Sequence, residues 1–175
     1  MHQFYELAYR CTGFTLTMLD EIHKKLELEM SEMATTRQVK TLQALNLQKV
    51  IQAVGVFSIF EAHLQRGLQC KNGFKEAELI LQQAGQYTLK DNFHNCYLAV
   101  NALKHGDGPS YARLVSKINA LPFIVDTPSK PAFDEGDVSG VSGLIKADES
   151  FIKYCFEIIN DVSECIAQHR PNFIV

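Results

Sequence analysis

Apolar residues recur at three- and four-residue steps along much of the chain, which is the pattern of amphipathic helices. The clearest case lies near the C-terminus, where residues 149–169 follow Asp148, a residue type that caps helix N-termini. One face of this segment carries Ile152, Cys155, Phe156, Ile159, Val162 and Ile166. The spacing therefore predicts a helix over 149–169.

Two longer helices are predicted in the N-terminal half of the chain. The first covers residues 14–33, because apolar side chains recur there on one face. They are Leu16, Leu19, Ile22, Leu26 and Met30. The second covers residues 37–69, which contain no proline and follow Thr35 and Thr36, either of which can act as an N-cap. Its apolar stripe consists of Leu47, Val50, Val54, Phe57, Phe60, Leu64 and Leu68.

A carboxylate, Glu61, lies within the apolar stripe of the 37–69 helix. Burying an unpaired charge in a core is costly, so such a residue requires a compensating feature. We expect Glu61 to pair with a cation or a hydrogen-bond donor, to be protonated, or to lie at the edge of the stripe facing solvent. If Glu61 pairs with a cation or a donor, the pair can belong to a ligand site.

The remaining pattern predicts shorter helices and one long loop. Helices are expected over 74–84, 92–105 and 109–121. Residues 122–148 are rich in proline and glycine and predict a loop. Three valines in it allow a short β-hairpin: Val125, Val138 and Val141. Residues 1–175 are thus predicted to form one all-α domain, an antiparallel up-and-down four-helix bundle with additional short helices and one long Pro/Gly-rich loop.

The composition narrows the class of protein. A chain of 175 residues can bury one core without a structural metal, and its net charge of -3 differs from the basic balance of a dedicated nucleic-acid binder. The five cysteines are scattered without a Cys-x-x-Cys pair, so we expect reduced thiols and no metal site. No run reaches the roughly 18 apolar residues of a membrane span, and the N-terminus lacks the pattern of a secretory signal. We therefore expect a cytoplasmic protein with no membrane, DNA or cofactor requirement.

Candidate chemistry is concentrated on the predicted 92–105 helix. Its core stripe contains Phe93, Cys96, Val100 and Leu103. His94, Asn101 and His105 share a different face. A neutral imidazole can act as acid or base near pH 7, and Asn101 can orient His105 or bind a substrate oxygen. Lys104 adds a positive charge, although a Lys-His-Gly sequence at a helix C-terminus is also ordinary capping chemistry.

A family resemblance rests on two segments, FSIFEAHLQRGL at 57–68 and YLAVNALKHGDG at 97–108. They resemble the HEPN families, compact all-α domains of prokaryotic defence, toxin–antitoxin and RNA-processing systems. The family motif is an arginine, commonly followed by a polar residue, and then a histidine a few residues later. Asn101 and His105 match the polar residue and the histidine, whereas Val100 occupies the arginine position.

The resemblance implies a metal-independent ribonuclease in which arginine and histidine, usually from two protomers, act on RNA during attack by the 2′-hydroxyl. On this basis catalytic roles are expected for His105, Asn101 and Lys104. Substrate-binding roles are expected for Glu61, His94 and Asp107. The expected partners are a second copy of the chain, RNA or a nucleotide, and a cognate protein.

Two alternatives stay open beside the ribonuclease interpretation. A valine cannot stabilise the negative charge that develops on a reacting phosphate. Because Val100 occupies the arginine position, two expectations stay open: RNA cleavage, and binding without cleavage. The first alternative is a non-catalytic interaction module that resembles an antitoxin. The second is a helical bundle that binds a small molecule in an internal pocket near Glu61.

Overall fold

The computed structural model describes residues 3–31, 35–127, 143–170 and 173 of the chain. Within these residues the fold is an all-α helical bundle, as predicted. Its helices are α1 (Gln3–Met30), α2 (Thr36–Leu68), α3 (Gly73–Gln83), α4 (Tyr87–His105), α5 (Pro109–Val115) and α6 (Glu149–His169). A short 3₁₀ turn, Ile118–Ala120, follows α5.

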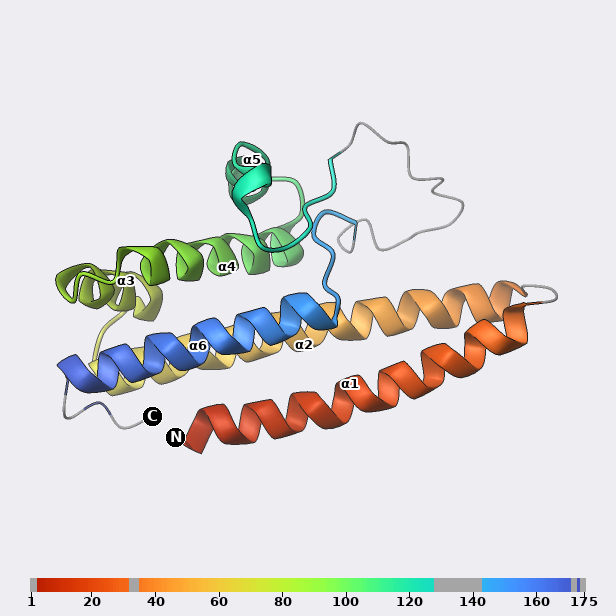
Figure 1. Ribbon diagram of the computed structural model, residues 1–175, viewed down its shortest axis with the longest axis horizontal. Coiled ribbons are helices and arrows are strands. Elements are labelled where there is room, and N and C mark those ends of the chain that lie inside the picture. Colours follow the sequence, from red (N-terminus) through yellow and green to blue (C-terminus); the bar gives the residue numbers. More distant parts are fainter. Residues whose placement is uncertain (1–2, 32–34, 128–142, 171–172, 174–175) are drawn as a thin grey trace.

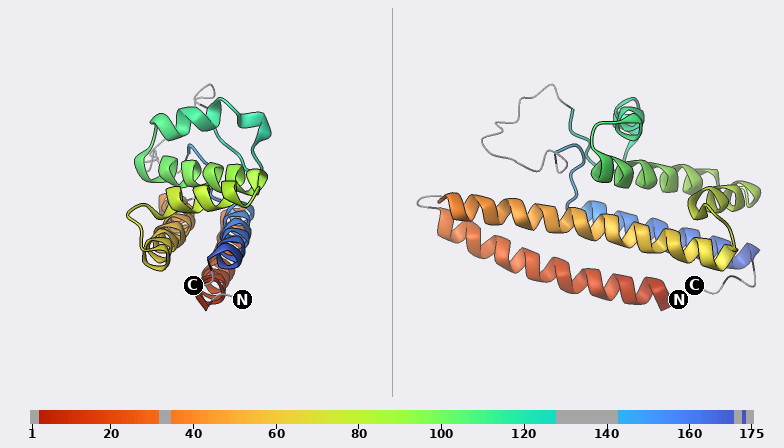
Figure 2. Two further views of the ribbon diagram at one scale, coloured as in Figure 1. Left: turned by 90° about the vertical axis from the view of Figure 1, so that its left-hand side faces the viewer. Right: turned by 180° about the vertical axis from the view of Figure 1, so that it is seen from behind.

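Four long helices, α1, α2, α4 and α6, alternate in direction along the bundle (Figure 1). The α2 and α6 helices form a middle layer, with α1 on one side and α4 on the other. The short α3 connects α2 to α4, and α5 lies across α4 near its C-terminal end (Figure 2). The paired α1 and α2 extend beyond the start of α6, so among the described residues one end of the bundle consists of these two helices alone.

The main core lies where α2, α3, α4 and α6 meet. Aromatic rings from three of these helices pack together there, with Phe74 and Phe93 at a centroid separation of 5.4 Å. Phe57 and Phe60 of α2 also contact Phe93, at 6.5 and 6.2 Å. Buried aromatic pairs add about 0.5–1.5 kcal/mol each beyond their area burial. This cluster therefore fixes α4 firmly against α2 and α3.

Local sequence signals set several helix ends. Thr35 forms a capping box with Gln38, whose backbone N–H donates to the Thr35 hydroxyl at 3.3 Å while the Thr35 N–H donates to the Gln38 side chain at 2.9 Å. Asp148 accepts from the backbone N–H of Phe151 at 2.9 Å. The predicted helix over 149–169 is confirmed with both ends at the predicted residues.

The N-terminal half differs from the prediction in extent and in burial. The first helix begins at Gln3 and not at residue 14, since residues 3–13 continue the same helix without a break. Ile22 and Leu47, both assigned to the core from their spacing, are 42% and 43% exposed. Spacing locates one apolar side of a helix, but α1 and α2 carry apolar side chains on more than one side.

The C-terminal half differs at two further places. The α4 helix begins at Tyr87, earlier than the predicted residue 92, and α5 ends at Val115, before the predicted residue 121. Val125 forms an isolated antiparallel bridge with Ile145. The predicted hairpin positions Val138 and Val141 lie outside the described residues. No helix of the described ranges is both long enough and apolar enough to cross a membrane.

Candidate functional site

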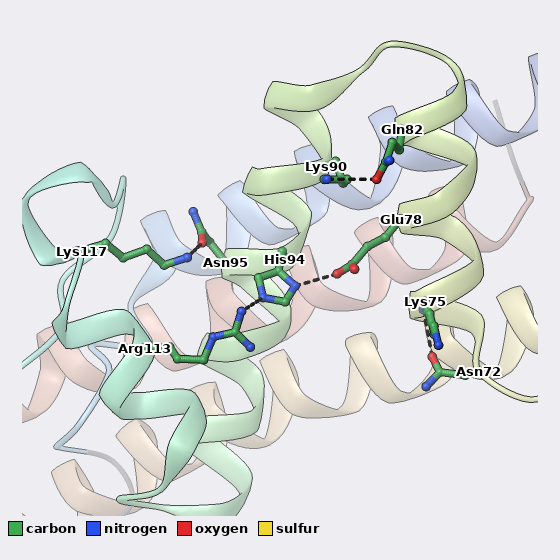
Figure 3. A network of polar contacts seen from close by, with 9 residues as sticks. All are labelled: Asn72, Lys75, Glu78, Gln82, Lys90, His94, Asn95, Arg113 and Lys117. Atoms are coloured by element: carbon green, nitrogen blue, oxygen red, sulfur yellow. Dashed lines mark hydrogen bonds and ion pairs between the residues drawn. The ribbon is translucent and has the colours of Figure 1, made fainter.

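The α4 helix separates a core face from a polar face. The predicted core residues Phe93, Cys96, Val100 and Leu103 are all buried. On the polar face, His94 and Asn101 are partly exposed and His105 is exposed. The polar face lies between α3 on one side and α5 on the other, so side chains of three helices can meet there (Figure 3).

His94 is the centre of a line of three side chains. Its Nδ1 lies 2.7 Å from Oε1 of Glu78 on α3, and its Nε2 lies 2.7 Å from Nη2 of Arg113 on α5 (Figure 3). A guanidinium only donates hydrogen bonds, so Nε2 must be the acceptor in this pair. The hydrogen of the neutral ring is therefore on Nδ1, which donates to Glu78. The two neighbours together set both the orientation and the tautomer of the imidazole.

This arrangement suits the recognition of an anion and the transfer of a proton. The guanidinium of Arg113 presents further N–H groups besides the one directed at His94, and a planar guanidinium binds phosphate or carboxylate oxygens in pairs. If an anion takes over the guanidinium, the lone pair of His94 Nε2 becomes free to accept a proton. Glu78 on the other nitrogen then stabilises the resulting imidazolium.

A second polar pair lies beside this line. Lys117 donates a hydrogen bond from Nζ to Oδ1 of Asn95, a side chain that is only 9% exposed (Figure 3). Burial lowers the pKa of Lys117, the nearby Arg113 lowers it further, and Asp91 opposes the shift. The ammonium and the guanidinium are thus held on the same flank of α4, where their mutual repulsion favours a bound negative charge.

The residues predicted to be catalytic lie further along α4. Lys104 and His105 are exposed in its last turn, and Gly106 ends the helix with φ of 76°, a conformation that glycine adopts readily. The side chains of Asn101, Lys104 and His105 form no hydrogen bond or ion pair with another residue that the structure describes. Asp107 is exposed in the following turn. The polar face therefore continues from His94 to the end of α4.

Glu61 lies away from that end of α4. Its neighbour Phe60 packs against Phe93 with the rings edge to face. Phe93 and His105 are separated by twelve residues, or about 18 Å along a helix. The structure thus does not bring Glu61 and His105 into one site. Glu61 is partly buried and forms no ion pair within the described ranges.

Glu78, Arg113 and Lys117 were missed by the sequence analysis. Glu78 is one of two carboxylates on α3, and the two cations follow a turn after α4, so no fixed spacing connects any of them to His94. Their proximity to α4 depends on how α3 and α5 pack. The sequence offered one signal for the two cations. The short segment 109–121 contains Arg113 and Lys117 and no acidic residue.

The chain matches no known family, characterised protein or solved structure in comparisons of sequence and fold. Among the described residues there is also no group of three or more histidine, cysteine, aspartate or glutamate side chains arranged to hold a metal ion. Any functional interpretation therefore depends on the geometry of this site and on the HEPN resemblance.

Proposed function

We propose that the chain binds single-stranded RNA along the polar face of α4 and cleaves it slowly without a metal. The observation that carries this proposal is the line Glu78–His94–Arg113, in which a histidine oriented by a carboxylate meets an arginine at 2.7 Å. The arginine binds a phosphate and the histidine accepts a proton. These are the two groups that attack by a 2′-hydroxyl requires.

The HEPN resemblance supports the same class of ligand. The family motif pairs an arginine with a histidine, and position 100 of this chain carries a buried valine instead. Arg113 supplies a guanidinium from another helix, beside His94. Asn101, Lys104 and His105 continue the polar face toward the end of α4, where a second phosphate of the same strand can be bound.

The proposed reaction begins when an RNA phosphate takes over the guanidinium of Arg113. His94 Nε2 then accepts the proton of the adjacent 2′-hydroxyl as its oxygen forms a bond to phosphorus. The bond from phosphorus to the 5′-oxygen breaks, and that oxygen takes a proton from water. The hydroxide that forms then takes the proton from the His94 imidazolium, which returns the ring to its neutral state. The products are a 2′,3′-cyclic phosphate and a 5′-hydroxyl end, and Glu78 stabilises the imidazolium that forms.

The test measures RNA binding and cleavage by the full chain in buffer with a metal chelator. Arg113→Ala should weaken binding about tenfold, through loss of a charge-assisted contact. His94→Ala should keep most of the binding and abolish the cyclic phosphate ends. Arg10→Ala, which removes an exposed arginine on α1 at the opposite side of the bundle, is the matched control and should change neither.

A comparison with His105→Ala separates the two histidines. If this variant alone abolishes cleavage, the site lies at the end of α4 and the role of His94 is wrong. If the wild-type chain leaves RNA intact but Arg113→Ala still weakens binding, the proposed RNA binding is supported and the proposed cleavage is wrong. Equal RNA affinity of the wild type, Arg113→Ala and Arg10→Ala would contradict the whole proposal.

A further inference from the structure

The α1–α2 pair carries most of the large apolar side chains that are exposed among the described residues. Six large apolar side chains that are exposed lie on α1 and four on α2, against three elsewhere. They are Leu7, Tyr9, Phe14, Met18, Ile22 and Leu28 on α1, and Val39, Leu47, Ile51 and Ile59 on α2. Exposed apolar residues concentrated on one pair of helices indicate an interaction surface.

The α2 helix presents one regular row of exposed or partly exposed residues, which we call the α2 seam. We call the side of the α1–α2 pair that carries this seam the outer side. The seam consists of Lys40, Ala44, Leu47, Ile51, Val54, Ser58 and Glu61. The steps between them alternate between four and three residues over three full heptads, which is the 3.5-residue period of helices that pack along their length. All seven are exposed or partly exposed, and Ile51 at the centre is 53% exposed.

The α2 seam is complementary to itself when two copies run antiparallel. With the two-fold axis at Ile51, the other positions pair in the order Leu47 with Val54, Ala44 with Ser58, and Lys40 with Glu61. The apolar residues thus meet at the centre and the small residues meet outside them. Opposite charges meet at both ends. A two-fold interface requires such self-complementarity. If one residue of the first copy contacts a second residue of the other copy, the symmetry repeats the same contact with the copies exchanged.

The charges at the ends of the seam are available for such pairing. Lys40 and Glu61 form no ion pair with any residue of the described ranges. They lie on the same helix and are separated by twenty-one residues, about 32 Å, so they cannot pair within one chain. The position of Glu61 in an otherwise apolar stripe is then explained by a lysine from outside the chain.

The α1 helix is also covered only in part by the other residues that the structure describes. Among the residues of α1 whose burial the structure describes, the buried ones are Thr12, Leu19 and Leu26. At the end of the bundle where α1 and α2 are the only described helices, the core is a small separate cluster of Leu19, Leu26 and Leu45. Two helices alone bury too little surface for independent stability, whereas four form a common bundle.

We propose that a second copy of this chain docks on the outer side of α1 and α2, with the two α2 seams antiparallel. The surface over the seam is about 32 Å long and two helices, or about 20 Å, wide. The resulting footprint of roughly 600 Å² per copy approaches the roughly 800 Å² per partner of a standard-size interface. Such a dimer does not depend on RNA binding, because the residues proposed to bind RNA belong to α4 and α5, and α4 lies across the α2–α6 layer from α1 (Figures 1 and 2).

A charge exchange at the ends of the seam tests the proposal. Sedimentation velocity of the full chain over a range of concentrations should show a monomer–dimer equilibrium. Lys40→Glu and Glu61→Lys should each weaken the dimer at least about tenfold, since each places like charges opposite one another at both ends. The double variant Lys40→Glu/Glu61→Lys should return the dissociation constant to within about threefold of the wild type.

An apolar substitution at the axis gives a second measurement. Ile51→Asp should be monomeric and retain its helical circular dichroism. Leu79→Asp changes a side chain of similar exposure, 44%, on α3 and should remain dimeric. A wild-type chain that is monomeric at all concentrations would overturn the proposal and indicate a different partner for this surface. Failure of the double variant to recover the dimer would overturn the antiparallel pairing.

Discussion

Arg113 of α5 donates a hydrogen bond to Nε2 of His94 on α4 at 2.7 Å, although nineteen residues separate them in the sequence. The contact exists because α5 turns back across α4 after Gly106 ends the helix. Glu78 approaches the same ring from α3. Three consecutive helices of the chain therefore build one polar site around a single imidazole.

The first prediction concerns the dependence of RNA binding on salt. Each phosphate contact made by a cation releases counterions, so the plot of log affinity against log salt concentration has a slope proportional to the number of contacts. Arg113→Ala should reduce the magnitude of this slope by about one and weaken binding at every salt concentration. Arg113→Lys should restore the slope but only part of the affinity, because an ammonium lacks the planar fork. An unchanged slope in Arg113→Ala would show that Arg113 does not contact an RNA phosphate.

The second prediction concerns the pair formed by Asn95 and Lys117. Asn95 is 9% exposed, so Lys117→Met should leave its amide without a partner and lower the free energy of unfolding by about 1–3 kcal/mol. Asn95→Leu alone should also be destabilising, since it removes the acceptor of a partly buried ammonium. The double variant Asn95→Leu/Lys117→Met should lose less than the sum of the two, because no polar group is then left unpaired.

Urea unfolding of the four proteins in that cycle gives the coupling free energy directly. Additive losses would mean that Asn95 and Lys117 act independently, in disagreement with the hydrogen bond between them.

Elements with one clear apolar face could be predicted from the sequence. The α6 helix is the best case, because Asp148 caps it and its single face packs in the core, so periodicity and capping agree on Glu149–His169. The core side of α4 was predicted for the same reason. Leu47 shows the limit: its spacing matches the stripe of α2, but the described chain has no element that covers it.

The site could be predicted only in part, since its residues lie on three helices. His94, Asn101 and His105 share a face of one helix, and the helical period is enough to group them. Their neighbours depend on tertiary packing. His94 forms polar contacts with Glu78 and Arg113, whereas His105 forms no hydrogen bond or ion pair with a described residue. Spacing within one helix therefore identified the polar face but selected the histidine without polar neighbours.

The third prediction concerns stability at alkaline pH. Burial, followed by the neighbouring Cys96 thiol, raises the pKa of Cys155 well above its ordinary value of 9.0. The folded chain then keeps the Cys155 proton at pH values where the unfolded chain releases it. The contribution of Cys155 to the free energy of unfolding is therefore constant below about pH 9. Above that pH it decreases, by at most about 1.4 kcal/mol per pH unit.

Urea titrations between pH 7 and pH 10.5 test this sign. Burial also raises the pKa values of Tyr154 and Cys165, so their effect adds to the decrease. Cys155→Ala should lower stability at pH 7 and make the decrease above pH 9 less steep. Val162→Ala, which shortens another buried and non-titrating side chain of α6, should lower stability without changing the steepness. A chain that becomes more stable above pH 9 would show that the sign is wrong.

The fourth prediction compares two glycines in different surroundings. A Cβ atom added to Gly73 would lie 2.6 Å from Cβ of Leu64 and 2.9 Å from the carbonyl oxygen of Glu61, both fixed on α2. Gly73→Ala should therefore separate the start of α3 from α2 and cost about 1–3 kcal/mol of unfolding free energy. Gly55 lies within α2 with no other group within 4 Å of the added Cβ, so Gly55→Ala should stabilise the chain by up to about 1 kcal/mol.

Thermal unfolding of the two variants at one protein concentration distinguishes crowding from helix propensity. Propensity alone would favour alanine at both positions, because each glycine belongs to a helix. Opposite shifts in the melting temperature, downward for Gly73→Ala and upward for Gly55→Ala, are expected only if α3 packs directly against α2. A stabilising Gly73→Ala would therefore contradict the close approach of the start of α3 to Leu64 and Glu61 of α2.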